Sequence, residues 1–476
     1  MGHVQGEWRE QRLLLAPSLD EVLASDHPVR LIDAFVVGMD LAALGFSKVA
    51  TQATGRPPYD PADLLRLYVY GYLNQIRSSR RLEREAGRNL EVQWLINHLT
   101  PSFKTIADFR RDHAASIVGV CRAFVRFCAD QSLYGGELVA IDGSKIEAAA
   151  SREKVITPRI LEKRMAAIEG KIAHYLAAMD EADQAEAAAE GAPPDIAAAL
   201  AVLRARRDEV QAQAQALADE GLSQRVIGEP EAKLMRTARA GHKVAYNAQT
   251  AVDDKHGLIA AFDLTSEGND QRQLLPMAEQ AKAALEAETL TVVADVGYSN
   301  GEQGRACEAA AITAVVPRQR TVNPKNSGLF TRDAFAYDAA KNSWTCPAGE
   351  TLVQIKVDHA KRKTTYATRA CGGCALKGAC TKAKRRMILR SFDEDAMEAM
   401  HRRSADNPAW MQRRRELAEH PFGVIKWMLG HPRFLVRGLK KAKSELALVV
   451  LGFNLKRAIA ILGVPALLAA LQPAAA

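Results

Sequence analysis

Two short apolar runs, each followed by an aspartate, constrain the fold of this 476-residue chain most strongly. Leu138–Ile141 precedes Asp142, and Leu290–Ala294 precedes Asp295. Short apolar runs bounded by turn residues such as Gly143 are typical of buried strands. Helical patterns occur between and after these runs, so the sequence predicts an α/β domain.

The stretch between the two runs contains a long helical insertion. Residues 158–222 are rich in Ala, Glu and Gln, and Gly191-Ala192-Pro193-Pro194 breaks them in the middle. This pattern predicts two antiparallel helices, an αα-hairpin. Because the segment has few aromatic residues, we expect it to project from the domain as a coiled-coil arm.

Strand patterns return after the arm. An alternating run at 244–252, a turn cluster at 253–257 and a second run at 258–264 predict a β-hairpin. A helix is expected at 271–286 and another strand at 311–317. The order of these elements predicts one α/β domain that is divided by two insertions.

The C-terminal part is expected to be helical. Residues 394–418 form a basic helical pattern, and Pro421 should remove a backbone hydrogen bond and clash with the carbonyl of Leu417. We therefore expect a kink or a restart of the helix near Glu419. The apolar segment 444–461 should pack on the α/β core.

Residues 1–130 also read as helical. Asp60-Pro61 is a helix start, with a capping acid followed by proline. Two basic helices follow short turns, at 76–85 and at 102–111. Repeated helix–turn–basic-helix units fit binding to a DNA end. A helical bundle with solvated arginines would have the same pattern, so both interpretations stay open.

The charge is concentrated near the C-terminus. The net charge of the chain is +8, and between His401 and Lys443 eleven Arg and Lys residues face three acids. This concentration favours a polyanionic partner. The N-terminus lacks a secretory signal pattern, and the uncharged run 458–471 is too short to span a membrane. We therefore expect a soluble protein without a membrane partner.

Three acids are candidates for a metal site: Asp142, Asp295 and Glu419. Metal-assisted phosphoryl transfer uses hard oxygen ligands, and carboxylates can hold two Mg²⁺ ions about 4 Å apart. Two strand-end aspartates and one acid from a neighbouring helix can converge in this way. Asp before Gly is also an ordinary turn residue, so each aspartate alone is ambiguous.

The surroundings of these acids resemble a known family. Arg415-x3-Glu419-x6-Lys426 matches the spacing of the Tyr-Arg-Glu-Lys signature of bacterial insertion-sequence DDE transposases. Asp142-Gly-Ser and Asp295-Val-Gly-Tyr resemble the first and second Asp motifs of that family. The resemblance covers nearly the whole chain, including an N-terminal helical domain. One position differs, because the signature tyrosine falls on Gln412.

The resemblance implies an RNase H-like core with an Asp-Asp-Glu site for Mg²⁺ or Mn²⁺. It implies cleavage at the terminal inverted repeats of a transposon, followed by attack of the freed 3′-OH on target DNA. Asp142 would bridge both metal ions, whereas Asp295 and Glu419 would each hold one. Arg415 and Lys426 would contact phosphate oxygens of the DNA end.

For some of these residues, and for the chain as a whole, a second interpretation stays open. Tyr298 is a candidate for stacking on a displaced base, although core packing explains it as well. Arg415 and Lys426 could be solvated helix charges, and His420 could be packed or exposed rather than close to the metal ions. The whole chain could also be a catalytically inactive DNA-binding protein derived from a transposase, or a metal-dependent nuclease. We expect a transposase that acts as a homodimer on double-stranded DNA in the bacterial cytoplasm, associated with the nucleoid.

The expected fold is an α/β, RNase H-like core that a helical hairpin and a Cys-rich insertion interrupt, after an all-helical DNA-binding domain. The expected boundaries are a helical DNA-binding domain at 1–130, the first core strand at 131–157, the helical hairpin at 158–235, the remaining core at 236–320, the Cys-rich insertion at 321–391, and the catalytic Glu helix with the C-terminal helices at 392–476.

Four of the seven cysteines form a cluster, C-x24-C-x2-C-x5-C, made of Cys346, Cys371, Cys374 and Cys380. Two closely spaced thiolates joined to two more across a loop suit tetrahedral Zn²⁺. Four reduced thiols without metal are the alternative. A structural zinc ion would stabilise an insertion that is poor in apolar residues.

Overall fold

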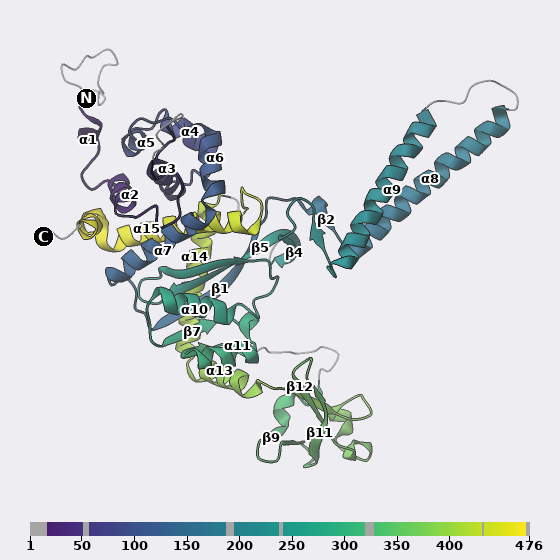
Figure 1. The fold of residues 1–476 in the computed structure, drawn as a ribbon. Helices are drawn as coiled ribbons and strands as arrows, with labels where there is room; N and C mark the ends of the chain where they lie inside the picture. Colours follow the sequence, from purple (N-terminus) through teal and green to yellow (C-terminus); the bar gives the residue numbers. More distant parts are fainter. Residues whose placement is uncertain are drawn as a thin grey trace, which may run out of the picture.

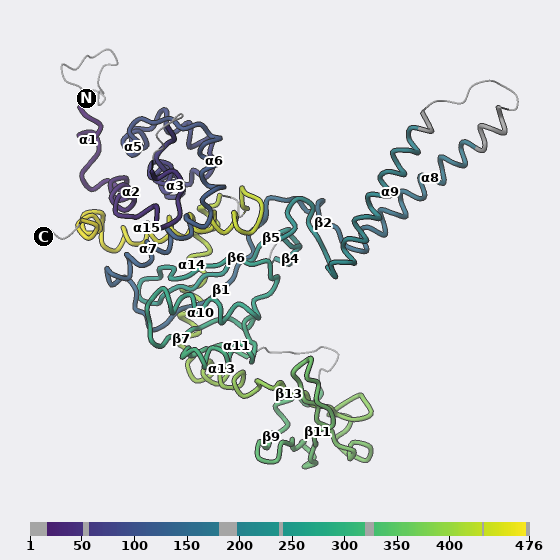
Figure 2. Tube along the Cα trace, viewed as in Figure 1, coloured from purple at the N-terminus to yellow at the C-terminus, as the bar shows by residue number. Residues whose placement is uncertain are grey.

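The computed structural model describes residues 17–50, 57–186, 195–237, 241–318, 328–430 and 433–472. Figure 1 shows a helical N-terminal part that packs on a central sheet, a long helical arm on one side, and a second, smaller sheet below the first. The trace in Figure 2 shows the C-terminal helix passing between the N-terminal helices and the central sheet.

The N-terminal part is built from helices only. Their bounds are α1 (Leu19–Val22), α2 (Pro28–Val37), α3 (Pro61–Leu73), α4 (Ser79–Ala86), α5 (Leu90–Leu95), α6 (Phe103–Asp112) and α7 (Ala114–Asp130). Asp60 caps α3 by accepting a hydrogen bond from the Ala62 N–H, and Ser102 caps α6 in the same way. The two basic helices expected from the sequence correspond to α4 and α6, which pack against each other.

The central sheet is mixed. Among the described residues its strands are β1 (Leu138–Glu147), β4 (Lys233–Thr237), β5 (Gly241–Asp253), β6 (Ile259–Thr265), β7 (Leu290–Ala294) and β8 (Ile312–Val315). The order is β4-β5-β1-β7-β8, and β6 also pairs with β5. β1 is antiparallel to β5 and parallel to β7, which is parallel to β8. The expected α/β domain is thus confirmed at the level of a mixed α/β fold.

Helices cover both faces of this sheet. On one face lie α10 (Leu274–Ala284) and α11 (Gly301–Ala309), with a core that contains Val139, Ile141 and Tyr298. On the other face lie α14 (Pro408–Met428) and α15 (Leu439–Leu471), with a core that continues into the N-terminal helices. Alternate residues of β1 therefore face different cores.

The arm consists of α8 (Pro158–Glu186) and α9 (Asp195–Asp219) and stands away from the rest of the chain in Figure 1. A two-stranded sheet of β2 (Val155–Ile156) and β3 (Arg225–Val226) joins it to the body. Beyond this sheet Glu229 is buried and accepts hydrogen bonds from the Ala150 N–H, the Tyr246 hydroxyl and the Gly438 N–H. The carboxylate of Glu229 thereby fixes the base of the arm to three separate elements.

The Cys-rich segment forms a second antiparallel sheet. Its strands, in the order β13-β12-β11-β10-β9, are β9 (Ala336–Asp338), β10 (Ser343–Thr345), β11 (Thr351–Asp358), β12 (Lys363–Ala367) and β13 (Met387–Ser391), and α12 (Lys377–Cys380) lies between the last two strands. Phe335, Trp344, Leu352, Tyr366 and Ile388 form a small core of its own. The segment is therefore less poor in apolar contacts than the sequence suggested.

The C-terminal helices differ from the expectation at two points, because the helix expected at 394–418 is divided and no restart follows near Glu419. α13 (Glu394–Asp406) ends before Asn407. The backbone of Asn407 is not helical, with a φ of −125° and a ψ of 66°, and this residue separates α13 from α14. α14 then continues through Pro421, so the expected restart near Glu419 is not found. Pro421 is buried beside Leu417 in the packed face of α14. Burial of this face offsets the cost of about 3 kcal/mol for an internal proline.

α15 is long and apolar enough, by composition, to cross a membrane, and no other helix of the described residues is. In this structure 61% of its apolar window is buried, and it packs against α2, α3, α7 and β6. Its polar residues have internal partners, because Asn454 bonds the backbone of Ile259 and Arg457 bonds the His256 carbonyl. α15 is therefore placed as a core helix.

Candidate active site

The two aspartates meet because their strands are neighbours in the sheet. Ile141 of β1 pairs with Ala294 of β7 in parallel register, so Asp142 and Asp295 follow at the same level. Asp295 comes directly after its strand, as expected, but Asp142 lies inside β1, which continues to Glu147. Beyond Asp142, β1 goes on pairing with β5 through polar residues as far as Glu147, within the first core strand expected at 131–157.

One oxygen of each carboxylate is held by a nearby glycine. Asp142 Oδ1 accepts a hydrogen bond of 2.8 Å from the Gly143 N–H, and Asp295 Oδ1 accepts one of 2.8 Å from the Gly297 N–H. The second oxygen of each aspartate points toward the same cation. The backbone thus orients both carboxylates before any ligand binds.

That cation is Arg414 of α14. Its Nη2 atom lies 3.2 Å from Asp142 Oδ2 and 3.8 Å from Asp295 Oδ2. The side chains of Arg414 and Asp142 are 14% and 20% exposed, whereas that of Asp295 is 42% exposed. Burial raises the pKa of Asp142, Arg414 lowers it, and the neighbouring Asp295 raises it. The site therefore holds two close carboxylates around one guanidinium.

Glu419, Arg415 and Lys426 lie together on a different face of α14. Because α14 is continuous from Pro408 to Met428, positions i, i+4 and i+11 form one stripe along it. All three residues are exposed. Glu419 lies five positions after Arg414, about 140° around the helix, so their side chains leave the helix in different directions. Within the described chain no hydrogen bond or ion pair joins Glu419 to the aspartate pair.

A second polar group lies behind Asp142, on the opposite face of β1. Asp270 accepts hydrogen bonds of 2.7 Å from both Asn247 and Gln249, and Lys145 Nζ lies 3.3 Å from it. Asn247 and Gln249 are fully buried. Asp270 was not among the candidates expected from the sequence; polar residues at alternate positions of the otherwise apolar strand β5 were the available signal.

Tyr298 belongs to this second group. Its side chain is fully buried in the core with α10 and α11, and its hydroxyl donates to Gln249 Oε1. Burial raises the pKa of the Tyr298 hydroxyl well above its usual value. Of the two interpretations left open by the sequence, this structure shows core packing, and the ring is not available to stack on a base. His420 is exposed and its ring lies near Phe453.

Many cations of the basic stretch are used inside the chain. Arg413 binds Asp254 and Glu416, Arg403 binds Glu308, and Lys443 binds Asp263. Arg433 donates to the carbonyls of Ala148 and Ala149. Arg110, in the basic helix α6, is likewise buried and donates to Tyr72. The surplus of positive charge available to a polyanion is therefore smaller than the sequence count.

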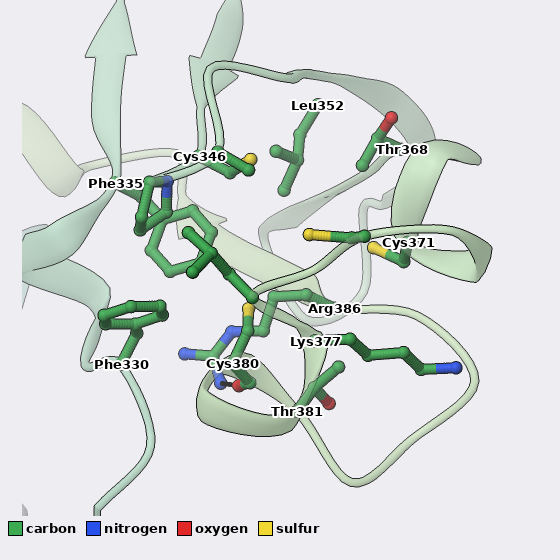
Figure 3. A pocket seen from close by; sticks show the side chains of 14 residues that line it. Phe330, Phe335, Cys346, Leu352, Thr368, Cys371, Lys377, Cys380, Thr381 and Arg386 are labelled. Atoms are coloured by element: carbon green, nitrogen blue, oxygen red, sulfur yellow. Dashed lines mark hydrogen bonds between the residues drawn. The ribbon is translucent and has the colours of Figure 1, made fainter.

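The four clustered cysteines line one pocket of the second sheet (Figure 3). Cys346 follows β10, Cys371 and Cys374 lie in the loop before α12, and Cys380 ends α12. All four are half-buried and none forms a disulfide. Burial raises the pKa of the Cys380 thiol, and the other three thiols raise it further. Figure 3 shows the sulfur atoms of Cys346, Cys371 and Cys380 around the same space.

In the part of the chain that the structure describes, no three His, Cys, Asp or Glu side chains are already arranged as a metal site. The Asp142–Asp295 pair nevertheless fits a divalent cation in two respects. It offers hard carboxylate oxygens, the ligands that Mg²⁺ and Mn²⁺ prefer. It also attracts a cation in this structure, because Arg414 lies against both carboxylates.

Two family models match the chain. One, described as "Transposase domain (DUF772)", matches residues 17–112, and the other, described as "Transposase DDE domain", matches residues 345–459. The second match includes Glu419, Arg415 and the four cysteines. Both matched models describe transposases, and the second describes a DDE domain. They support, more narrowly, an insertion-sequence transposase that acts in DNA transposition, as the resemblance predicted.

One solved structure is similar to this chain, at low sequence identity. Among solved structures, the chain is similar to the piggyBac transposase in a synaptic complex with hairpin DNA, with a TM-score of 0.35 and 9% sequence identity. The match covers 91% of this chain and 74% of that one. So low a TM-score supports no detailed comparison. A search of curated proteins finds no match.

Proposed function

We propose that this transposase cleaves the terminal inverted repeats of its own element and joins them to target DNA, with Asp142, Asp295 and Glu419 as the catalytic acids. The observation that carries the proposal is the convergence of Asp142 and Asp295 from adjacent parallel strands. Each has one oxygen fixed by a backbone N–H and one directed to a shared cation. Two carboxylate oxygens that face the same cation are suited to bind a divalent metal ion.

The strand order supports an RNase H-like core. A β-hairpin of β5 and β6 lies antiparallel to β1, and the strands β7 and β8 run parallel to β1 on its other side. In this architecture α14 packs against both β1 and β7, and its Arg414 reaches both aspartates. The helix that carries the third acid is therefore already packed beside the pair.

Mg²⁺ or Mn²⁺ at this site would supply Lewis-acid stabilisation of the attacking and leaving oxygens during phosphoryl transfer. Asp142, on the central strand β1, would hold both ions, whereas Asp295 and Glu419 would each hold one. Glu419 faces solvent here, so its carboxylate reaches the pair only after a movement of its side chain or of α14. Arg415 and Lys426 on the same stripe would contact the phosphates that flank the scissile bond.

We propose that the N-terminal helices bind the DNA end. The helices α4 and α6 pack against each other and both carry exposed basic residues, and Arg80 of α4 lies over the ring of Phe103 of α6 at 5.1 Å. The exposed cations are Arg80, Arg81, Arg84, Lys104 and Arg111. Because two ends must be cut together, we expect a homodimer on double-stranded DNA. Such a protein would work in the bacterial cytoplasm at the nucleoid.

We also propose that Cys346, Cys371, Cys374 and Cys380 bind one structural Zn²⁺ ion. Their common pocket, their reduced state and their partial burial support this proposal. The thiolates would need to close around the ion, since four tetrahedral ligands are required. The zinc ion would join the loop before α12 to the end of β10 and so stabilise this sheet.

A metal-dependent nuclease without strand transfer would use the same acids. A catalytically inactive DNA-binding protein would not need them, and the oriented pair therefore favours an enzyme. The test is cleavage and joining of a duplex that carries the element's terminal repeats. The sequence of these repeats is taken from the DNA that flanks the gene. Wild type should cut the end and join it to target DNA. Cutting without joining would favour the nuclease.

Single substitutions Asp142→Asn, Asp295→Asn and Glu419→Gln separate the enzyme from the binding protein. Each should abolish cleavage while the variant still binds the end duplex. Matched substitution of Asp395→Asn on α13, an exposed acid paired with Arg390, should leave cleavage unchanged. Wild-type cleavage by any one of the three variants would remove that acid from the proposed site.

A further inference from the structure

Arg414 was not singled out by the sequence, yet it is the side chain that joins the two aspartates. Its Nη2 atom faces the one oxygen of Asp142 and the one of Asp295 that the glycine N–H groups leave free. We propose that Arg414 is a resident cation that occupies the Asp142–Asp295 pair and must leave it when a divalent metal ion binds. This inference rests on the proposed function, which assigns the pair to metal.

The contacts of Arg414 are incomplete compared with those of its neighbour. Arg413 uses its Nε, Nη1 and Nη2 atoms to donate to Asp254 and Glu416. Arg414 forms its two ion pairs through Nη2 alone, and its Nε atom is buried without a hydrogen-bond partner among the described residues. A guanidinium with five donors binds carboxylates best through two parallel hydrogen bonds. Arg414 is therefore held by charge more than by directed hydrogen bonds.

Charge explains why the arginine stays in place without metal. Two carboxylates at the same level of adjacent strands repel each other, and burial makes the charged form of Asp142 less favourable. A single positive charge between them relieves both effects. A divalent ion carries twice that charge and accepts oxygen ligands in its own geometry, so it competes directly for the same two oxygens.

Departure of Arg414 does not require α14 to unfold. The helix is fixed by its buried residues Leu417, Ala418 and Ile425, whereas the arginine side chain is long and can turn toward solvent by rotation about its own bonds. Metal binding is therefore coupled to a local side-chain change. The apparent affinity for metal equals the intrinsic affinity of the free pair multiplied by the fraction of molecules in which Arg414 has left the pair.

Binding of Mn²⁺ to the full-length protein without DNA tests the proposal, measured by electron paramagnetic resonance of the free ion. Arg414→Gln should bind Mn²⁺ about tenfold or more tightly than wild type. This is the effect expected if Arg414 occupies the pair in about nine of ten wild-type molecules. Arg414→Lys keeps the charge and should return the affinity toward the wild-type value. Arg402→Gln, which removes an exposed arginine from the neighbouring helix α13, should bind as wild type does.

A merely structural arginine would behave differently. Its loss would weaken Mn²⁺ binding or leave it unchanged, and either result for a folded Arg414→Gln protein would overturn the proposal. Circular dichroism checks the fold, and Arg414→Met provides a second neutral variant in case Gln is not tolerated. If neither neutral variant binds Mn²⁺ more tightly than wild type, Arg414 is not the competitor.

The same assay distinguishes this inference from the proposed function. Asp142→Asn and Asp295→Asn should each abolish the Mn²⁺ site. If they do, but the neutral variants of Arg414 bind no more tightly, the metal site stands and the role of Arg414 fails. If both asparagine variants keep wild-type affinity, the metal site itself is wrong, and the resident-cation role is wrong with it.

Discussion

Gly143 and Asp270 lie so close together that a Cβ atom on Gly143 would come within 2.7 Å of Asp270 Oδ1. The same atom would lie 2.3 Å from Gln249 Nε2. The absence of a side chain at Gly143 therefore allows the buried polar group to reach the strand directly behind Asp142. This close approach links the strand that carries Asp142 to the polar group on the far face of the sheet.

Gly143→Ala should for this reason destabilise the protein and impair cleavage together. Overpacking in a closed core costs about 1–3 kcal/mol in unfolding free energy, and the displaced strand would misplace Asp142. Urea unfolding and end cleavage measure the two effects. Gly268→Ala is the matched control, because a Cβ atom there meets nothing within 4 Å. Wild-type stability of Gly143→Ala would show that the group behind β1 adapts freely.

Arg415→Gln should weaken binding to the transposon-end duplex and reduce its dependence on salt. Loss of one phosphate contact lowers the slope of log affinity against log salt by about 0.9. A salt series of binding measurements gives this slope. Arg413→Gln should leave the slope unchanged, because the Arg413 guanidinium is used within the chain by Asp254 and Glu416. An unchanged slope for Arg415→Gln would identify Arg415 as a solvated charge.

Protein purified without chelator should contain one zinc ion per chain. Cys371→Ser and Cys374→Ser should each lose it, as measured by elemental analysis, and chelation should lower the melting temperature. Cys307→Ser is the control, since this thiol is buried in the central core and burial raises its pKa to about 12. Four freely titratable thiols in native protein that contains no zinc would contradict the site.

Glu445→Ala should destabilise the junction between the N-terminal helices and α15. Glu445 is fully buried and pairs with Arg77 at 3.0 Å, while its other oxygen accepts from the Leu435 N–H. Removal of one partner of a buried ion pair costs about 3–5 kcal/mol, measured here by chemical unfolding. Asp108→Ala breaks an exposed pair with Arg111 and should cost far less. If both substitutions lowered the free energy of unfolding equally, the buried Glu445–Arg77 pair would contribute no more to stability than the exposed pair.

Much of the fold could be predicted from local patterns. The apolar runs before Asp142 and Asp295, the hairpin between them and the alanine-rich arm each correspond to an element in the structure. These patterns are reliable because burial of a strand or of a helix face requires a matching period in the sequence. Asp142 and Asp295 were likewise visible, since each follows such a run, whereas Glu419 was indicated by its spacing from Arg415 and Lys426.

Other features depended on contacts between distant segments. Pro421 predicted a break in α14, but packing of its buried face keeps the helix continuous. Asp270 belongs to a loop far along the chain from Asp142, and only the fold of the sheet brings it behind β1. No local pattern carries information of this kind.

The sequence by itself determined the class of fold, the arm, the cysteine cluster and the three acids, because short-range periodicity and residue chemistry specify them. Only the tertiary structure decided which arginine faces the aspartates. Arg414 and Arg415 are neighbours with the same side chain, yet about 100° of helix rotation separates them. The orientation of α14 on the sheet, set by the burial of its apolar face, directs Arg414 to the carboxylates and leaves Arg415 with Glu419 in solvent.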